Sequence, residues 1–144
     1  LLRDTAYESL LIRKRRDYHG QIAKVLETEF PLIDETQPEL IAGHYTEAQL
    51  TDDALRYWHR AGRYAIARSA DQEAMGHLHK GLELLQSLPR TKERARLELD
   101  LQLLLGPLVI GTKGNGASSG LNIVERKSLD NGSVTKPNKG KVHV

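Results

Sequence analysis

The stretch from Ala54 to Leu85 reads ALRYWHRAGRYAIARSADQEAMGHLHKGLELL, and it repeats small residues around one large aromatic residue at helical spacing. This spacing places Trp58, Ala61, Gly62 and Ala65 on one face of a first helix, and Ala74, Leu78 and Gly81 on one face of a second. Small residues let two antiparallel helices approach closely, and Trp58 fills the gap that remains. The stretch therefore predicts a closely packed helical pair, which is a scaffold rather than a catalyst.

This spacing resembles the tetratricopeptide (TPR) repeat, which has Trp, then Leu-Gly, then an aromatic residue in its first helix, and Ala with a large apolar residue in its second. The matching positions are Trp58, Gly62, Ala74 and Leu78, whereas Ala61 replaces the Leu and Ala65 replaces the aromatic. A second phase of the repeat reads Tyr45, Ala54, Trp58 and Ala61. The helix that contains Trp58 then serves twice, once as a second helix and once as a first. We therefore expect an all-α, TPR-like antiparallel stack, a fragment of an α-solenoid, rather than a regular repeat array.

Six helical segments are expected, bounded by capping residues and prolines. They cover about residues 4–12, 13–28, 36–48, 51–69, 71–88 and 91–106. Asp4 or Thr5 is expected to cap the first segment, and Thr51, Asp71 and Thr91 are expected to cap the last three in turn. The first should turn Ala6, Tyr7, Leu10 and Leu11 inward, and the second Tyr18, Ile22, Val25 and Leu26. Pro31 should end the second segment, and Gly106-Pro107 should end the sixth.

Residues 107–144 differ in composition from the rest of the chain. They hold runs such as GTKGNGASSG and KPNKGK, with little apolar surface to offset the entropy of ordering. They also carry 6 Lys+Arg and 2 Asp+Glu, against 15 and 17 in residues 1–106. The overall charge of +2 therefore comes from this segment. We expect a disordered, flexible C-terminal tail after a helical domain at 13–106.

The composition also limits the cellular compartment and the class of protein that we expect. Because the chain has no cysteine, disulfides and thiolate metal sites are excluded, and the cytoplasm is the expected location. No apolar run approaches the ~20 residues of a membrane span, and the N-terminus does not resemble a secretory signal. The chain opens at Leu1-Leu2 without an initiator methionine, so we expect it to be a piece of a longer protein.

Several motifs are candidates for a phosphate-binding, metal or catalytic site, but a structural explanation is favoured for each. The segment from Gly106 to Lys113 has Gly-Thr-Lys where a phosphate loop needs Gly-Lys-Ser/Thr, and it follows a helix rather than a strand. The histidines His44, His59, His77 and His79 lack the spacing of a metal site, and His44 is expected in the core with His19 at a helix junction. We expect no metal, no cofactor and no catalytic residue.

Three features of the sequence indicate what the chain could bind. The basic run Arg13–Arg16 can contact phosphates, but a short basic run on a helix is usually a solvated face. Trp58 can line a peptide groove, although its small neighbours favour a core position. On the sixth helix, one side carries Leu97, Leu101, Leu104 and Leu105, while Leu99 and Leu103 point elsewhere and are expected to form an exposed strip that promotes self-association.

Residues 1–117 resemble one family in particular, the bacterial signalling proteins that join a class III adenylate/guanylate cyclase to an AAA-type (STAND) ATPase and a TPR-like region. The segments that carry the resemblance are LLRDTAYESLL (1–11), RRDYHGQIAKVLE (15–27), PELIAGHYTEAQL (38–50), ALRYWHRAGRYAIARSA (54–70), EAMGHLHKGLELLQSLP (73–89) and ELDLQLLLGPLVIGTKG (98–114). The resemblance implies that residues 1–12 end a winged-helix-like part of the ATPase module. It also implies that the phosphate loop and the cyclase carboxylates lie upstream. Residues 118–144 depart from the family and are expected to be non-native.

The function expected from the sequence is a non-catalytic module for protein interaction and signal transmission. Its partners would be the neighbouring ATPase and cyclase domains, or a peptide or protein effector. One alternative is a basic helical fragment that binds nucleic acid, which DNA retention sensitive to salt would favour. A second is a small hydrolase that uses histidine and carboxylates, which any turnover would favour.

Overall fold

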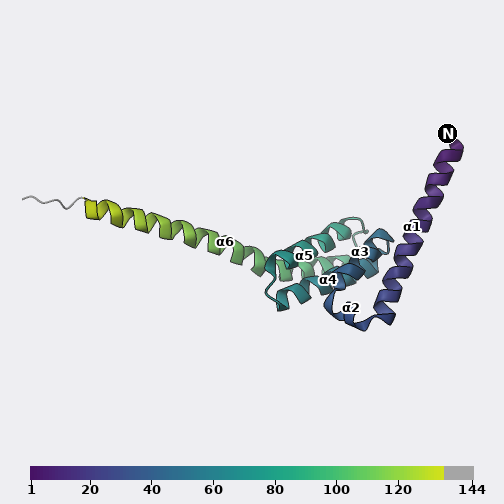
Figure 1. Cartoon of the computed structure of the whole chain (residues 1–144), viewed down its shortest axis with the longest axis horizontal. Coiled ribbons are helices and arrows are strands. Elements are labelled where there is room, and N and C mark those ends of the chain that lie inside the picture. The colour runs from purple at the N-terminus through teal and green to yellow at the C-terminus, as the bar shows by residue number, and fades with distance from the viewer. Residues whose placement is uncertain (135–144) are drawn as a thin grey trace, which may run out of the picture. The chain divides into compact units, whose positions relative to one another are not determined.

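The computed structural model describes the backbone of residues 1–134 and the side chains of residues 1–113. In this part of the chain the structure contains six helices and no strand, so the all-α prediction is confirmed. The helices are α1 (Leu2–Glu29), α2 (Pro31–Thr36), α3 (Pro38–Glu47), α4 (Thr51–Ala67), α5 (Asp71–Gln86) and α6 (Lys92–Val134) (Figure 1). The chain divides into two compact units, Leu1–Leu108 and Val109–Val144, and the core described below lies in the first.

The core is built around α4, which packs against both α3 and α5. Its buried residues recur every three or four positions: Ala54, Leu55, Tyr57, Trp58, Ala61, Gly62 and Ala65. Gly62 marks the closest approach, because a Cβ atom added there would lie 2.5 Å from Cδ2 of Leu78 on α5. Gly81 similarly faces Leu101 of α6, at 3.1 Å from an added Cβ. The small residues thus let α4 and α5 pack closely, as the sequence predicted, and Gly81 also leaves room for the Leu101 side chain of α6.

The same turn joins α3 to α4 and α4 to α5. Gln49 and Ser69 have positive φ angles of 60° and 58°. The backbone N–H that follows each one donates to a carbonyl five residues earlier, Leu50 to Tyr45 at 3.0 Å and Ala70 to Ala65 at 2.9 Å. This pattern is the Schellman motif, which satisfies carbonyls at a helix end and reverses the chain. The caps predicted at Thr51 and Asp71 are wrong, because these residues are already helical and make no capping hydrogen bond.

The N-terminal part of the chain differs from the prediction in two ways. Residues 4–28 do not form two segments but belong to one helix, because nothing around residue 12 breaks it. Neither Asp4 nor Thr5 caps this helix, which begins at Leu2. Pro31 does follow the end of α1, but it also opens the short helix α2, where proline suits the first turn.

Most of the apolar residues predicted to face inward on α1 are exposed. Tyr7, Leu10 and Leu11 have relative exposures of 64%, 49% and 50%, and Ala6 is exposed as well. Tyr18, Ile22 and Val25 are also exposed, whereas Leu26 packs partly against the core beside the fully buried Ala23. The apolar periodicity of α1 is real, but the helix contacts α2 and α3 only toward its C-terminal end (Figure 1).

The prediction that the last helix ends at Gly106-Pro107 is wrong, as is the prediction that residues 112–134 are irregular. Thr91 does cap α6, accepting a hydrogen bond from the Arg94 N–H at 3.1 Å, but the helix then runs through Pro107 to Val134. The stop signal fails because Leu108, just beyond the proline, packs into the core cluster with Leu101. The part of the predicted tail at 135–144 lies outside the described residues.

The predicted division of the leucines on α6 holds with one exception. Leu101 is buried and Leu104 and Leu105 are partly buried against the core. Leu99 and Leu103 are exposed, at 56% and 64%, so the apolar strip that the sequence predicted is confirmed. Leu97 was expected on the packed side but is exposed, because it lies in the second turn of the helix, before α6 reaches the core.

Candidate functional site: a cleft between α3 and α5

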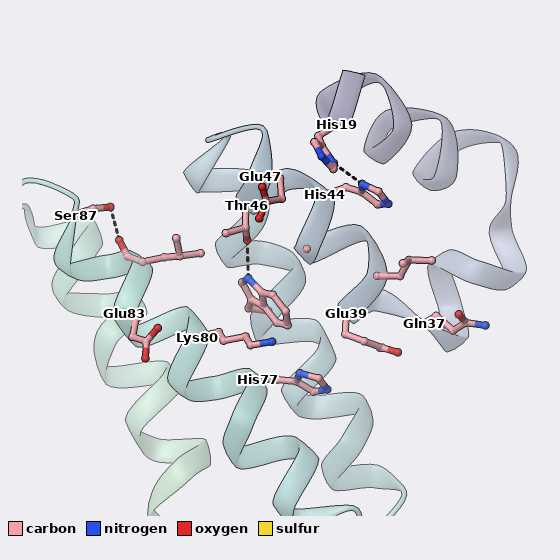
Figure 2. Close-up of a pocket in the computed structure, with 14 residues that line it drawn as sticks. His19, Gln37, Glu39, His44, Thr46, Glu47, His77, Lys80, Glu83 and Ser87 are labelled. Atoms are coloured by element: carbon pink, nitrogen blue, oxygen red, sulfur yellow. Dashed lines mark hydrogen bonds between the residues drawn. The ribbon is translucent and has the colours of Figure 1, made fainter. Parts of the chain in front are cut away.

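A cleft of about 840 Å³ lies between α3 and α5, with α4 at its floor (Figure 2). Its α3 wall consists of Glu39, Leu40, Gly43, His44, Thr46 and Glu47, and its α5 wall of His77, Lys80, Glu83, Leu84 and Ser87. Trp58 forms the floor, while His19 of α1 and Gln37 lie at the margin. The volume is within the range of small-molecule sites, about 300–1,000 Å³.

The indole of Trp58 is held in place from both walls. Its Nε1–H donates to the Thr46 hydroxyl on α3 at 2.9 Å. On the α5 side, the His77 ring stacks on it with centroids 5.6 Å apart, and the Lys80 ammonium lies 4.5 Å from the ring centroid (Figure 2). Trp58 is 5% exposed, so it is a core residue and also the base of the cleft. The prediction that Trp58 is buried between the helices after Pro38 and Asp71 is therefore confirmed.

Glycine widens the cleft at one point of the α3 wall. Gly43 lies inside α3, and a Cβ atom added there would meet nothing within 4 Å. A side chain at this position would therefore occupy the cleft without displacing the wall. Gly76 on α5 is equally open but does not line the cleft, which makes it a matched control.

Two histidines join α1 to the α3 wall. Nδ1 of His19 and Nδ1 of His44 are 2.9 Å apart, so one ring donates to the other (Figure 2). This bond requires at least one neutral ring, because two protonated nitrogens repel. Burial lowers the pKa of His44, and the neighbouring His19 lowers it further, while Glu47 opposes the change. His19 thus lies at a helix junction, as predicted, but its partner is on α3 rather than on a separate segment of α1.

A polar network behind the cleft fastens α1 and α2 to α4. Asp34 accepts a hydrogen bond from the Tyr57 hydroxyl at 2.5 Å and two from the Arg60 guanidinium, both at 2.9 Å. Burial alone would raise the pKa of Asp34, but these hydrogen bonds and the Arg60 charge outweigh it and keep the pKa below its usual value. Glu27 of α1 accepts hydrogen bonds from the Tyr45 hydroxyl on α3 and from the Arg56 guanidinium on α4, the latter at 3.1 Å. The network positions the α3 wall relative to the floor.

The nine repeat positions predicted from the sequence are all buried, and Trp58 is the only one of them that lines the cleft. They are Tyr45, Ala54, Trp58, Ala61, Gly62, Ala65, Ala74, Leu78 and Gly81. They form the framework, whereas the cleft is lined mainly by polar residues between them. The signal for those polar residues was their helical spacing beside the buried positions, which sequence reasoning did not use.

The other candidate groups of the sequence do not converge. Among the residues that the structure describes, no group of three or more His, Cys, Asp or Glu side chains is placed to hold a metal ion. The basic run Arg13–Arg16 is exposed on α1, and Arg15 lies 3.6 Å from Glu47. Gly106, Gly111 and Lys113 belong to the helix α6 rather than to a loop. No described helix is long and apolar enough to cross a bilayer.

Comparison with known proteins gives one distant relative. The chain is 26% identical over 114 residues to an uncharacterized protein of Rhizobium meliloti (strain 1021). The aligned part covers 79% of this chain but only 11% of that protein, so the chain spans about a tenth of the length of the curated relative it matches. No family model and no solved structure matches the chain.

Proposed function

We propose that this chain is a non-catalytic, TPR-like module for protein interaction and signal transmission. The observation that carries the proposal is the cleft between α3 and α5. Its base is a fixed indole, its walls are two helices held by a common neighbour, and polar groups line its margin. A preformed recess with an aromatic base and polar groups around it is suited to anchor side chains of a peptide.

The connection to α1 supports the transmission part of the proposal. His44 lies in the cleft wall and also bonds to His19 of α1. Glu47, at the end of the same wall, lies 3.6 Å from Arg15 of α1. An occupant that contacts these two residues of α3 therefore competes with their contacts to α1. In this way occupancy of the cleft would alter how α1 is held, and α1 would pass the change to whatever adjoins its exposed face.

The parent protein is proposed to be a longer cytoplasmic regulator, an ATPase joined to a nucleotide cyclase, as the family resemblance implies. The partial match to a much longer relative is in keeping with a module inside a large chain. The neighbouring ATPase and cyclase domains would then be the first partners of this module. Reading the coding frame on both sides of this segment tests the proposal directly. A phosphate loop and paired cyclase carboxylates upstream are expected, and an unrelated upstream frame contradicts the parentage.

The interaction role is tested by filling the cleft. Peptides selected from a random display library on the wild-type chain should lose binding to Gly43→Phe, because the phenyl ring takes their place. Gly76→Phe adds the same ring to α5 outside the cleft and should bind them as the wild type does. Gly43→Ala separates the effect of bulk from that of removing a helical glycine. Selected peptides that bind Gly43→Phe and the wild type equally would refute the cleft as the binding site.

A further inference from the structure

The cleft carries more acidic than basic side chains. This imbalance bears on the chemistry of the partner, and the inference drawn from it rests on the proposed function. Three carboxylates line the cleft, from Glu39, Glu47 and Glu83, against one lysine, Lys80. Glu47 is partly neutralised by Arg15 at 3.6 Å. Within the described part of the chain, Glu39 and Glu83 make no ion pair. One unneutralised carboxylate therefore stands on each wall.

The single lysine does not neutralise these carboxylates. Lys80 and Glu83 are three residues apart on α5, a spacing that normally favours an ion pair. Instead, the Lys80 ammonium lies over the face of Trp58, 4.5 Å from the ring centroid (Figure 2). A cation is attracted to an indole face by the negative charge of the π system. The base of the cleft thus already accommodates a cation, and the carboxylate of Glu83 stays in solvent.

Apolar surface is interleaved with these charges. Leu40 on the α3 wall is 41% exposed, although it lies next to the fully buried Ile41. Leu84 on the α5 wall is partly buried and packs against both core clusters. These two leucines offer apolar surface between the carboxylates, whereas Trp58 beneath them is only 5% exposed and is covered by Lys80 and His77. An occupant must match both features.

We propose that the cleft binds a segment of a partner protein that carries both apolar and basic side chains, with the apolar ones on Leu40 and Leu84 and the basic ones paired with Glu39 and Glu83. An acidic segment is disfavoured because it would bring like charges together and gain only Lys80. A purely apolar segment would leave both carboxylates facing a surface that excludes water, which is costly for a charged group.

The probes are three acetylated and amidated peptides that share leucines at helical spacing and carry Lys, Glu or Gln at all other positions. Trp58 is the only tryptophan of the chain, so its fluorescence reports on the base of the cleft. The Lys peptide should bind at least about tenfold more tightly than the Glu peptide at low salt, with the Gln peptide between them. Raising the salt to 0.5 M should reduce the difference between Lys and Glu peptides.

A double variant tests the two carboxylates. Glu39→Gln with Glu83→Gln should weaken binding of the Lys peptide by about 3–10-fold and leave the Gln peptide unchanged. Glu35→Gln, an exposed carboxylate of α2 outside the cleft, is the matched control and should change neither. If the three peptides bind equally, the proposal of a basic partner is overturned. The interaction role still stands in that case, provided that Gly43→Phe abolishes the binding. Tighter binding of the Glu peptide, or no binding of any peptide, would also overturn this inference. Only library peptides insensitive to Gly43→Phe would refute the proposed function itself.

Discussion

The α4–α5 pair and the first half of α1 have similar apolar spacing but opposite surroundings. On α4 and α5, every residue of the predicted face is buried, and Ala54, Ala74 and Leu78 have no exposed surface. On α1, the corresponding face keeps Tyr7 and Leu11 at least half exposed. The spacing of apolar residues fixes which side of a helix seeks a partner. Whether a partner is present depends on the rest of the chain, and α1 has one only where α2 and α3 reach it.

The composition of the two faces also differs, and this difference explains why only one of them packs closely. The α4–α5 pair combines one large aromatic residue with glycine and alanine, so that the backbone of α4 comes close to the Leu78 side chain of α5. The first half of α1 carries large apolar side chains and arginines, without glycine before Gly20. A face of small residues indicates a helix close by, whereas a face of large ones indicates only an apolar surface to be covered.

The largest effect is expected at the centre of the close contact. Trp58→Ala should lower the free energy of unfolding by roughly 3–5 kcal/mol, because it leaves a cavity among α3, α4 and α5 and removes the bond to Thr46. Urea melts of both proteins measure it. His79→Ala, at an exposed site on α5, is the control and should change little. A loss below about 1 kcal/mol for Trp58→Ala would mean that the indole does not support the core.

The second effect separates the close contact from an open helix surface by using one substitution at two glycines. Gly62→Ala forces a Cβ atom against Leu78, which is fully buried and cannot move aside. Overpacking costs about 1–3 kcal/mol, and the gain in helix propensity of about 0.5–1 kcal/mol offsets only part of it. Gly76→Ala has open space and should be stabilising by about that gain.

Thermal and urea melts of both glycine variants should therefore shift in opposite directions. If Gly62→Ala is stabilising as well, α4 and α5 are not in close contact at Leu78, and the comparison between the two regions fails.

Much of the core was predictable because its signals are local. The positions of Trp58, Gly62 and Gly81 follow from helical spacing alone, and their burial needed no knowledge of distant residues. The helix boundaries were less predictable, since Gln49 and Ser69 adopt the left-handed conformation without being glycine. Pro107 gave a stop signal that the packing of Leu108 overrides. Such outcomes depend on tertiary contacts, which a local pattern does not contain.

The candidate site was less predictable than the fold. The sequence indicated that Trp58 can line a groove, but it gave no sign that Glu39 and Glu83 would line the same cleft from different helices. The bond between His19 and His44 joins residues 25 positions apart and requires the path of α2 to be known. Cleft residues are brought together by the packing of α3 and α5 on α4, so they follow only once that packing is established.

The free energy of unfolding should depend on pH through His44, which joins α3 to α1. Burial and the neighbouring His19 lower the pKa of His44 in the folded chain, so the unfolded chain binds the proton more readily. The free energy of unfolding should therefore be largest above about pH 6.5, fall as the pH decreases below it, and level off below the folded pKa. Burial lowers the pKa of His59 and His77 as well, which adds to the same slope.

Urea melts between pH 5 and 7.5 measure this slope. His44→Asn removes one titrating ring but retains an amide in its place, so its slope should be shallower than that of the wild type. His79→Asn changes an exposed histidine on α5 and should keep the wild-type slope. An unchanged slope in His44→Asn would show that the pKa of His44 is not lowered in the folded chain.

The smallest effect on stability is expected at the exposed strip of α6. Leu103 is 64% exposed and Leu101, two residues earlier, is 2% exposed, so one helix carries both environments. The double variant Leu99→Gln and Leu103→Gln should change the free energy of unfolding by no more than about 0.5 kcal/mol per site. It should nevertheless reduce self-association, because an uncovered apolar strip favours contact between copies. Sedimentation velocity over a range of concentrations measures this, with Leu101→Ala as a contrasting variant that should lose about 2–5 kcal/mol. A wild-type chain that stays monomeric at high concentration would show that exposed leucines on this helix are harmless, and that the difference between covered and uncovered faces has no consequence for assembly.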